Sequence, residues 1–312
     1  MGLIPIEIVE QNVWTKDIDL NFEKKPTARD LSVFCRQFVS MTKAGVTIIE
    51  AMKMLVEQTD NRALKQAAEA VRASLEKGES FQTPEAVLVY SPDGLSGMSR
   101  VYHKLYRTRL CRGKYRDAER FVLINNWEAT YFDFNEEKIV EIAMKASEIG
   151  VDTMVLDDGW FAGRVNEWAG GLGDWIENKD RLPNGLNKLA NRINELGMHF
   201  GLWFEPEMVN PKSCLFESHP DWIIHTAGRK QSLSRNQYTL NLSNKEVCDY
   251  IIGAVGRVLR TANIEYVKWD MNRYMSEVGS AFLPSDRQGE TMHRYILGLY
   301  YILETLVTEF PN

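Results

Sequence analysis

The fold is indicated most clearly by residues 121–160, FVLINNWEATYFDFNEEKIVEIAMKASEIGVDTMVLDDGW. A short apolar run that ends in polar residues and a tryptophan stands at each end of this stretch, and a helical pattern lies between them. Such an alternation predicts βα units and a parallel sheet. It continues with a helical pattern over residues 184–197 and a third apolar run, HFGLWFEPE, at residues 199–207.

Polar and aromatic residues gather at the C-terminal end of each apolar run. They are Asn125, Asn126 and Trp127; Asp157, Asp158 and Trp160; Trp203, Glu205 and Glu207; and Lys268, Asp270 and Asn272. In a (β/α)8 barrel the active site lies at this end of the strands. A doubly wound sheet also places ligands there, but usually with a glycine-rich first turn, and the chain contains no GxGxxG motif. The pattern therefore favours an α/β fold of the (β/α)8 barrel type.

The composition excludes several classes of protein. The 312 residues are 44% apolar and 26% charged, and the net charge of −6 leaves no basic surface for nucleic acid or an anionic membrane. The scattered histidines form no HExxH motif, so we expect no metal and no cofactor. No apolar run reaches the ~18 residues of a membrane span. Four separated cysteines and the lack of a signal-peptide pattern predict a cytoplasmic protein.

Residues 27–78 have a different pattern from the rest of the chain. Thr27 and Asp30 form a plausible helix cap ahead of an apolar stripe, Gly45 and the polar run 59–61 interrupt the helical pattern, and Gly78 closes it. These signals predict three short amphipathic helices. We expect a small all-α bundle without catalytic residues of its own.

Carboxylates and tryptophans at a barrel mouth, without metal or phosphate motifs, suggest a carbohydrate site. Asp157 or Asp158 would bind sugar hydroxyls through charge-assisted hydrogen bonds, and Trp203 or Trp160 would stack on the apolar face of the ring. Packing is the alternative role for Trp160, as for Trp168, Trp175 and Trp222. One of the two aspartates has an alternative role as a helix cap.

The stretch EYVKWDMNR, residues 265–273, places Lys268, Asp270 and Asn272 on one face of a strand, because side chains two residues apart point the same way. Retaining glycoside cleavage uses two carboxyl groups about 5 Å apart. Asp270 suits the nucleophile, since Lys268 would lower its pKa. A plain ion pair between Lys268 and Asp270 is the alternative. Arg235, in the polar run QSLSRNQY, could equally be a solvated loop residue.

The region from about Phe81 to the C-terminus resembles glycoside hydrolase family 36, the bacterial and fungal α-galactosidases. The motifs that carry the resemblance are FQTPEAVLVYS (81–91), LYRTRL (105–110), VLINNWEATYFDF (122–134), LDDGWF (156–161), GLWFEPEMVNP (201–211), SRNQYTLNLS (234–243) and YVKWDMNR (266–273).

This resemblance implies retaining hydrolysis of terminal α-D-galactosyl residues from oligosaccharides by a (β/α)8 barrel. Asp270 would be the nucleophile, and Asp157 and Asp158 would bind galactose hydroxyls. The residues that would complete the sugar pocket are Trp203, Arg235, Lys268 and Asn272. The implied partners are an α-galactoside oligosaccharide and further copies of the chain in a homo-oligomer. Another α-glycosidase on the same barrel is an alternative.

Residues 1–80 resemble the cytoplasmic domain of the type II secretion system F family, which includes platform proteins of type IV pili. The resemblance rests on GLIPIEI (2–8), ARDLSVFCRQFVSMTKAGVTIIEAM (28–52), LVEQTDN (55–61) and LEKGESF (75–81). It implies a helical bundle that binds assembly partners, and hence a non-enzymatic role as the alternative function. Such domains lead into transmembrane helices, and no stretch of that kind is evident here.

We therefore predict three segments. Residues 1–80 form the helical bundle, residues 81–118 form the tail of a β-sandwich or a linker, and residues 119–312 form the first part of a barrel. A full barrel takes ~250 residues, and nothing after Asp270 matches the family's acid/base aspartate. We expect an α-galactosidase with impaired or absent turnover and a tendency to aggregate. The two resemblances meet at EKGESFQTPEA (76–86) without a linker, which favours a chimera over an evolved fusion.

Overall fold

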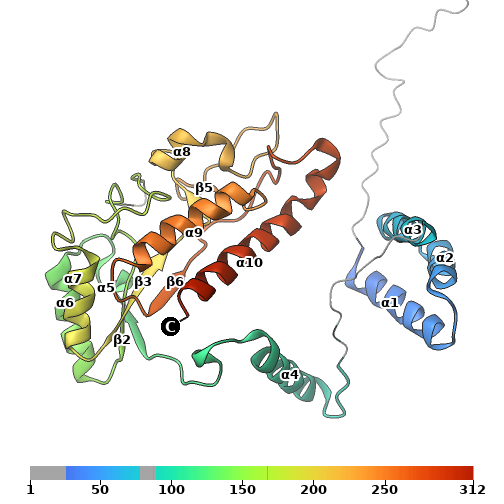
Figure 1. Ribbon diagram of the computed structural model, residues 1–312, viewed down its shortest axis with the longest axis horizontal. Coiled ribbons are helices and arrows are strands. Elements are labelled where there is room, and N and C mark those ends of the chain that lie inside the picture. Colours follow the sequence, from blue (N-terminus) through green and yellow to red (C-terminus); the bar gives the residue numbers. More distant parts are fainter. Residues whose placement is uncertain (1–25, 78–86, 88, 167, 312) are drawn as a thin grey trace, which may run out of the picture. The chain divides into compact units, whose positions relative to one another are not determined.

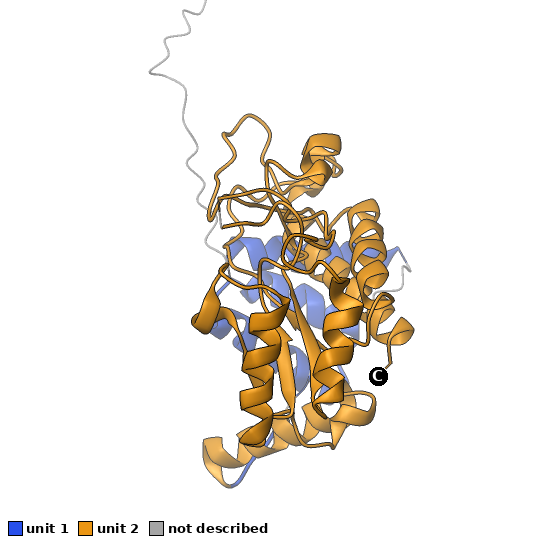
Figure 2. Ribbon diagram, turned by 90° about the vertical axis from the view of Figure 1, so that its left-hand side faces the viewer, with its two compact units in different colours: residues 1–92 blue, residues 93–312 orange. Residues whose placement is uncertain are grey.

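The computed structural model describes residues 26–77, 87, 89–166 and 168–311. The chain divides into two compact units, residues 1–92 and residues 93–312, which Figure 2 colours separately. The predicted boundaries at residues 80 and 118 stay a prediction.

The first unit consists of α1 (Ala28–Lys43), α2 (Ile48–Gln58) and α3 (Arg62–Glu76) (Figure 1). Thr27 and Asp30 form a reciprocal capping box at the start of α1, as their spacing predicts. Gly45 adopts a φ of +84°, which lets the chain turn after α1. The predicted helical bundle is confirmed, whereas the expected closure at Gly78 lies outside the described residues.

The core of this unit is small. Met52, Val56 and Ala68 are buried, and the partly buried side chains packed on them are Phe34, Phe38, Val71 and Leu75. The outer ends of the predicted apolar stripes remain exposed, with 45% of Leu31 and 54% of Ile48 accessible to solvent. Three short helices bury only the stripe that faces their neighbours, and the flanking apolar positions stay outside the core.

The second unit opens with helical segments. They are α4 (Gly94–Leu105), the π-helical turn Tyr106–Leu110 and the 3-10 turn Lys114–Arg116. Met98, Tyr102 and Leu105, spaced by four and three residues, form the half-buried side of α4 and its end. The sequence predicts a sandwich tail or a linker here, whereas residues 94–110 and 114–116 are helical.

A parallel sheet organises the rest of the second unit. Its strands are β1 (Leu123–Asn125), β2 (Thr153–Leu156), β3 (His199–Phe204) and β6 (Tyr266–Trp269), in that spatial order. Helices α6 (Glu136–Glu148), α7 (Gly185–Glu195) and α9 (Lys245–Leu259) connect successive strands, and α10 (Thr291–Glu309) follows β6 (Figure 1). Four neighbouring parallel strands with helical crossovers correspond to half of an eight-stranded barrel. The predicted partial α/β barrel fold is confirmed.

Shorter elements lie in the connections that follow these strands. They are α5 (Trp127–Thr130), β4 (Met208–Val209), α8 (Cys214–Ser218), β5 (Tyr238–Thr239) and the 3-10 turns Pro220–Trp222 and Ser285–Glu290. Strands β4 and β5 pair antiparallel, with Val209 opposite Tyr238. This pairing places the polar run at residues 231–238 near the segment that follows β3.

The two faces of the parallel sheet differ in chemistry, because successive side chains point to opposite sides. Met154 and Leu156 of β2, with Phe200, Leu202 and Phe204 of β3, belong to the core that also contains the apolar sides of the helices. The alternate positions face the other side and carry the residues of the candidate site. Within the described part of the chain, no helix combines the length and apolarity that a bilayer crossing requires.

Candidate active site

All seven residues predicted for the site line one pocket of about 200 Å³. They are Asp157, Asp158, Trp203, Arg235, Lys268, Asp270 and Asn272, and Trp127 completes the lining. The pocket lies where the strands end: Asp157 and Asp158 directly follow β2, and Asp270 and Asn272 follow β6. Ligand sites of parallel α/β proteins form at this end of the sheet.

Most of these side chains meet because parallel strands end together. Trp203 of β3 is in register with Lys268 of β6. Arg235 reaches the pocket by another route, since it precedes β5 and the β4–β5 pair places it there. Arg235 has a φ of +52°, a left-handed conformation, and its side chain is exposed.

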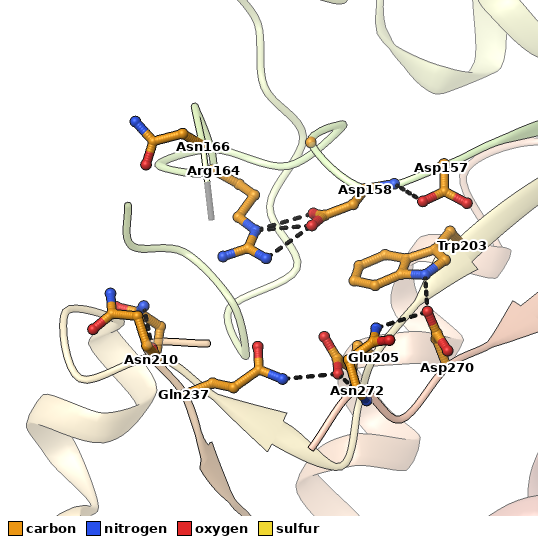
Figure 3. Close-up of polar contacts among 12 residues, drawn as sticks. Asp157, Asp158, Arg164, Asn166, Trp203, Glu205, Asn210, Gln237, Asp270 and Asn272 are labelled. Carbon is orange, nitrogen blue, oxygen red and sulfur yellow. Dashed lines mark hydrogen bonds and ion pairs between the residues drawn. The ribbon is translucent and has the colours of Figure 1, made fainter. Parts of the chain in front are cut away.

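The Asp270 carboxylate is held by three hydrogen-bond donors, of which Figure 3 shows Trp203 and Asn272. Its Oδ2 accepts from Trp203 Nε1 at 3.0 Å and from Asn272 Nδ2 at 2.7 Å, and its Oδ1 accepts from the backbone N–H of Met271 at 3.1 Å. Burial by itself raises the pKa of Asp270, but these donors and the charge of Lys268 together hold that pKa below its ordinary value. The side chain is therefore an ionised, oriented carboxylate at neutral pH.

The hydrogen-bond partner of Lys268 differs from the one that the sequence suggests. Its Nζ lies 2.8 Å from Oδ2 of Asp157, to which Asn125 also donates. Lys268 affects the pKa of Asp270 only through its charge, because two other donors already bond to Oδ2 of Asp270. The long ammonium side chain reaches Asp157 at the end of a strand two positions away in the sheet.

Asp158 makes a buried ion pair with Arg164. Both nitrogens Nε and Nη2 of Arg164 donate to the carboxylate, at 3.1 and 2.8 Å, and both side chains are almost wholly buried (Figure 3). Burial raises the pKa of Asp158 even though Arg164 opposes the shift. Arg164 carries no sequence signal of a site residue, since it lies in a loop rather than at a strand end.

The tryptophans divide between the core and the pocket. Trp160 is fully buried and donates its indole N–H to the backbone oxygen of Trp203, so its ring is not available to a sugar. Trp175 and Trp222 are buried as well, while Trp168, for which packing was also the alternative, is 65% exposed. Trp203 lines the pocket although only 2% of it is exposed, and the Phe161 ring lies parallel to it with 6.4 Å between ring centroids.

Two residues at strand ends received no role from the sequence: one lines the pocket, and the other is bonded to the pocket residue Asn272. Trp127 was recognised at the end of the first strand but given no role, and it lines the pocket. Glu205 lies just after β3 and is buried, and its pKa is raised to about 7, chiefly by burial. Among the described residues, no group of three or more His, Cys, Asp or Glu side chains could hold a metal ion.

The strand ends of this half barrel thus present carboxylates, amides and tryptophans around one small pocket. Residues 80–312 match the family model for Melibiase. Because that match spans well over half of the sequence, the chain belongs to the melibiase family.

Characterised relatives agree with this assignment. The chain is 59% identical over 238 residues to alpha-galactosidase AgaA of Geobacillus stearothermophilus and 45% identical to alpha-galactosidase 1 of Pediococcus pentosaceus, and each alignment covers 76% of this chain and 32% of the relative. The crystal structure of GH36 alpha-galactosidase AgaA superposes with a TM-score of 0.71 at 60% identity, over 75% of this chain and 32% of that one. The chain thus spans about a third of the length of these relatives.

Variants of AgaA have been solved in complex with 1-deoxygalactonojirimycin, raffinose and stachyose. A second family model, Type II secretion system (T2SS), protein F, matches residues 34–106. The two matches overlap over residues 80–106. The predicted resemblances to two families are therefore both confirmed.

Proposed function

We propose that residues 93–312 carry the galactose-binding and nucleophile half of a retaining α-galactosidase site. The observation that carries the proposal is the Asp270 carboxylate, which lines the pocket and is kept ionised by Trp203 and Asn272. A nucleophilic carboxylate of this kind would attack the anomeric carbon, break its bond to the aglycone oxygen, which leaves with the electron pair, and form a covalent glycosyl intermediate that water then hydrolyses.

The remaining lining residues have the chemistry to bind a sugar. Asp157 and Lys268 form a charged pair at the pocket wall, and such groups make strong hydrogen bonds to hydroxyls. Asp158 is fixed in place by Arg164. Arg235 and Asn272 add donors, and Trp127 and Trp203 add apolar surface. We assign galactose as the sugar on the strength of the relatives, which are alpha-galactosidases.

The described pocket offers no unengaged carboxyl group as general acid. Besides Asp270, its lining carboxylates are Asp157 and Asp158, and a cation binds each of them. Protonation of a leaving group contributes ~10²–10⁴-fold to the rate. We therefore propose that this chain binds galactose but hydrolyses α-galactosides poorly.

Isothermal titration of the 312-residue chain with galactose and with glucose tests the proposal. The two sugars differ only in the configuration of one hydroxyl group, so galactose should bind more tightly if the relatives' preference extends to this chain. Hydrolysis of p-nitrophenyl α-galactoside, followed in parallel, should be weak. Equal affinity for both sugars, or no binding of either, would contradict the proposal.

A cytoplasmic location and a homo-oligomeric assembly stay predictions from the sequence. The four free cysteines, of which Cys35, Cys111 and Cys214 are exposed, support the first.

A second function is favoured for the N-terminal helices by the match to protein F of the type II secretion system. We infer that α1, α2 and α3 bind a protein partner and take no part in catalysis. The exposed apolar residues Leu31, Ile48 and Ile49 support this inference. Cross-linking of the chain in its host should then yield adducts that disappear when Ile48 and Ile49 are replaced by serine, and adducts that persist would contradict it.

A further inference from the structure

Glu205 is one of two glutamates in the WFEPE segment, residues 203–207, and the proposed function assigns no role to either glutamate. It directly follows β3 and is only 1% exposed. An ionisable side chain is costly to bury unless it is paired or hydrogen-bonded. The hydrogen bonds that Glu205 accepts therefore offset part of the cost of its burial.

Glu205 joins two loops that carry pocket residues (Figure 3). Its Oε1 accepts a hydrogen bond from the backbone N–H of Asn272 at 2.6 Å and one from Nε2 of Gln237 at 2.8 Å. Asn272 lies in the turn after β6, and Gln237 lies between Arg235 and β5. The end of β3 is thus tied to both segments that surround the pocket.

The contact with Asn272 continues to Asp270. The side-chain amide of Asn272 donates to Oδ2 of Asp270 at 2.7 Å, next to the indole N–H of Trp203. We propose that Glu205 is a positioning residue that fixes the 270–272 turn and thereby orients the Asp270 carboxylate. The catalytic meaning of this orientation rests on the proposed function, whereas the orientation itself can be measured without any sugar.

The second carboxylate of the segment has a different set of partners. Glu207 accepts from Nε1 of Trp269 at 2.9 Å and from the hydroxyl of Tyr295 in α10, and it is also buried. These partners differ from Asn272 and Gln237, which donate to Glu205. Glu207 is therefore a matched control: it has the same chemistry and burial, and it lies two residues further along the chain.

The electrostatic setting makes Glu205 responsive to pH. Its pKa is raised to about 7, chiefly by burial and to a smaller extent by the nearby charges of Asp270 and Asp158, while the donors Asn272 and Gln237 oppose the shift. The ionised form places a second negative charge near Asp270. The protonated form keeps an oxygen that can accept both hydrogen bonds and removes that charge.

The experiment observes the indole signals of the eight tryptophans in the ¹⁵N-labelled full chain without ligand. The Trp203 signal, assigned with a Trp203→Phe variant, reports on the hydrogen bond to Asp270. In Glu205→Ala both donors lose their acceptor, so we expect the Trp203 signal to shift and to lose protection from hydrogen exchange. In Glu205→Gln an oxygen acceptor is retained and the signal should stay close to its original position. Glu207→Gln should move the Trp269 signal instead.

An unchanged Trp203 signal in Glu205→Ala would overturn the proposal, as would equal changes in Glu205→Ala and Glu207→Gln. If Glu205→Ala does not fold, a pH titration of the wild type and of Glu205→Gln tests the positioning role instead. The Trp203 signal of the wild-type chain should show an inflection near the Glu205 pKa of about 7, and Glu205→Gln should lack it. No histidine is among the residues that line the pocket, so superimposable curves would also overturn the proposal.

Sugar binding is measured separately on the same proteins. Loss of the buried acceptor should weaken galactose binding roughly tenfold in Glu205→Ala and leave it nearly unchanged in Glu205→Gln. A wild-type chain that binds no galactose refutes the proposed function, and the Trp203 signal still decides whether Glu205 positions Asp270. The two claims therefore fail in different measurements.

Discussion

The indole N–H of Trp203 donates a hydrogen bond to Oδ2 of Asp270, at 3.0 Å, across 67 positions of sequence. This contact joins two strands that are neighbours in the sheet, because β3 pairs with β6 and Trp203 stands opposite Lys268. It gives Trp203 a role beyond apolar contact, since the ring that borders the pocket also orients the candidate nucleophile. The pocket is thus organised before any ligand enters.

The dependence of turnover on the leaving group follows from the engaged aspartates. A substrate whose leaving group needs no proton should bypass the lack of an available acid in the described pocket. We expect 2,4-dinitrophenyl α-galactoside to be cleaved at least about 10²-fold faster than raffinose, because general acid catalysis contributes ~10²–10⁴-fold. Equal rates of release for both substrates, measured with the same preparation, would show that an acid is present.

Replacing Lys268 by methionine should destabilise the protein and weaken galactose binding. The change leaves the Asp157 carboxylate, which is 5% exposed, with Asn125 but without its ammonium partner. Because Lys268 is itself 38% exposed, we expect a loss of only about 1–3 kcal/mol in the free energy of unfolding, measured with urea. Lys145→Met, which removes an exposed pair with Glu141, is the matched control and should have no measurable effect. A stability loss confined to Lys145→Met would contradict the role of the Asp157 pair.

Stability should depend on pH through Glu205. Its pKa of about 7 in the folded protein exceeds the value of roughly 4.3 in an unfolded chain, so the native state holds the proton more tightly. This contribution to the free energy of unfolding is fully present at acidic pH. As the pH rises to about 7, up to ~3 kcal/mol of it is lost. Urea unfolding of the wild type and of Glu205→Gln at several pH values checks this. The wild type should lose stability over this interval relative to the variant, and parallel curves would contradict the shift.

Two glycine substitutions should act in opposite directions. A Cβ at Gly201 in β3 would lie 2.9 Å from Cγ2 of Val155 and 3.1 Å from Cβ of Tyr266, so Gly201→Ala should cost about 1–3 kcal/mol through overpacking. A Cβ at Gly253 in α9 would meet nothing within 4 Å. Gly253→Ala should therefore raise the free energy of unfolding by up to ~1 kcal/mol. Thermal unfolding of both variants measures these changes in stability. An increase in stability in Gly201→Ala would contradict the close packing around β3.

The sequence identifies the pocket residues that follow directly from strand geometry. Asp157, Trp203 and Lys268 could be placed together because parallel strands end at one edge and side chains alternate with a period of two. The same reasoning could not find the true partner of Lys268, because reach across a sheet depends on its twist and on which acceptors are already occupied. The first choice, Asp270, is satisfied instead by Trp203 and Asn272.

Residues held by loops were beyond prediction for a related reason. Arg164 pairs with Asp158 through the path of the loop after β2, and no local sequence pattern encodes that path. Gln237 meets Glu205 through the antiparallel pairing of β4 with β5. These strands have two residues each, too few for alternation to be recognised. The burial that raises the pKa of Glu205 is likewise a property of the assembled unit.

Calorimetric titration with 1-deoxygalactonojirimycin, which was solved bound to a variant of AgaA, tests the central claim most directly. The compound is a cationic galactose analogue, and its ammonium group should pair with the ionised Asp270 carboxylate. We predict one site on the wild-type chain and a loss of at least about tenfold in affinity in Asp270→Asn, because charge-assisted hydrogen bonds contribute roughly 1.5–3 kcal/mol. Asp249→Asn, which alters an exposed ion pair with Lys245 and a hydrogen bond from Tyr301, both outside the pocket, should bind like the wild type. Equal affinity of the wild type and Asp270→Asn, or no binding to either, would contradict the assignment of Asp270 to a galactose site.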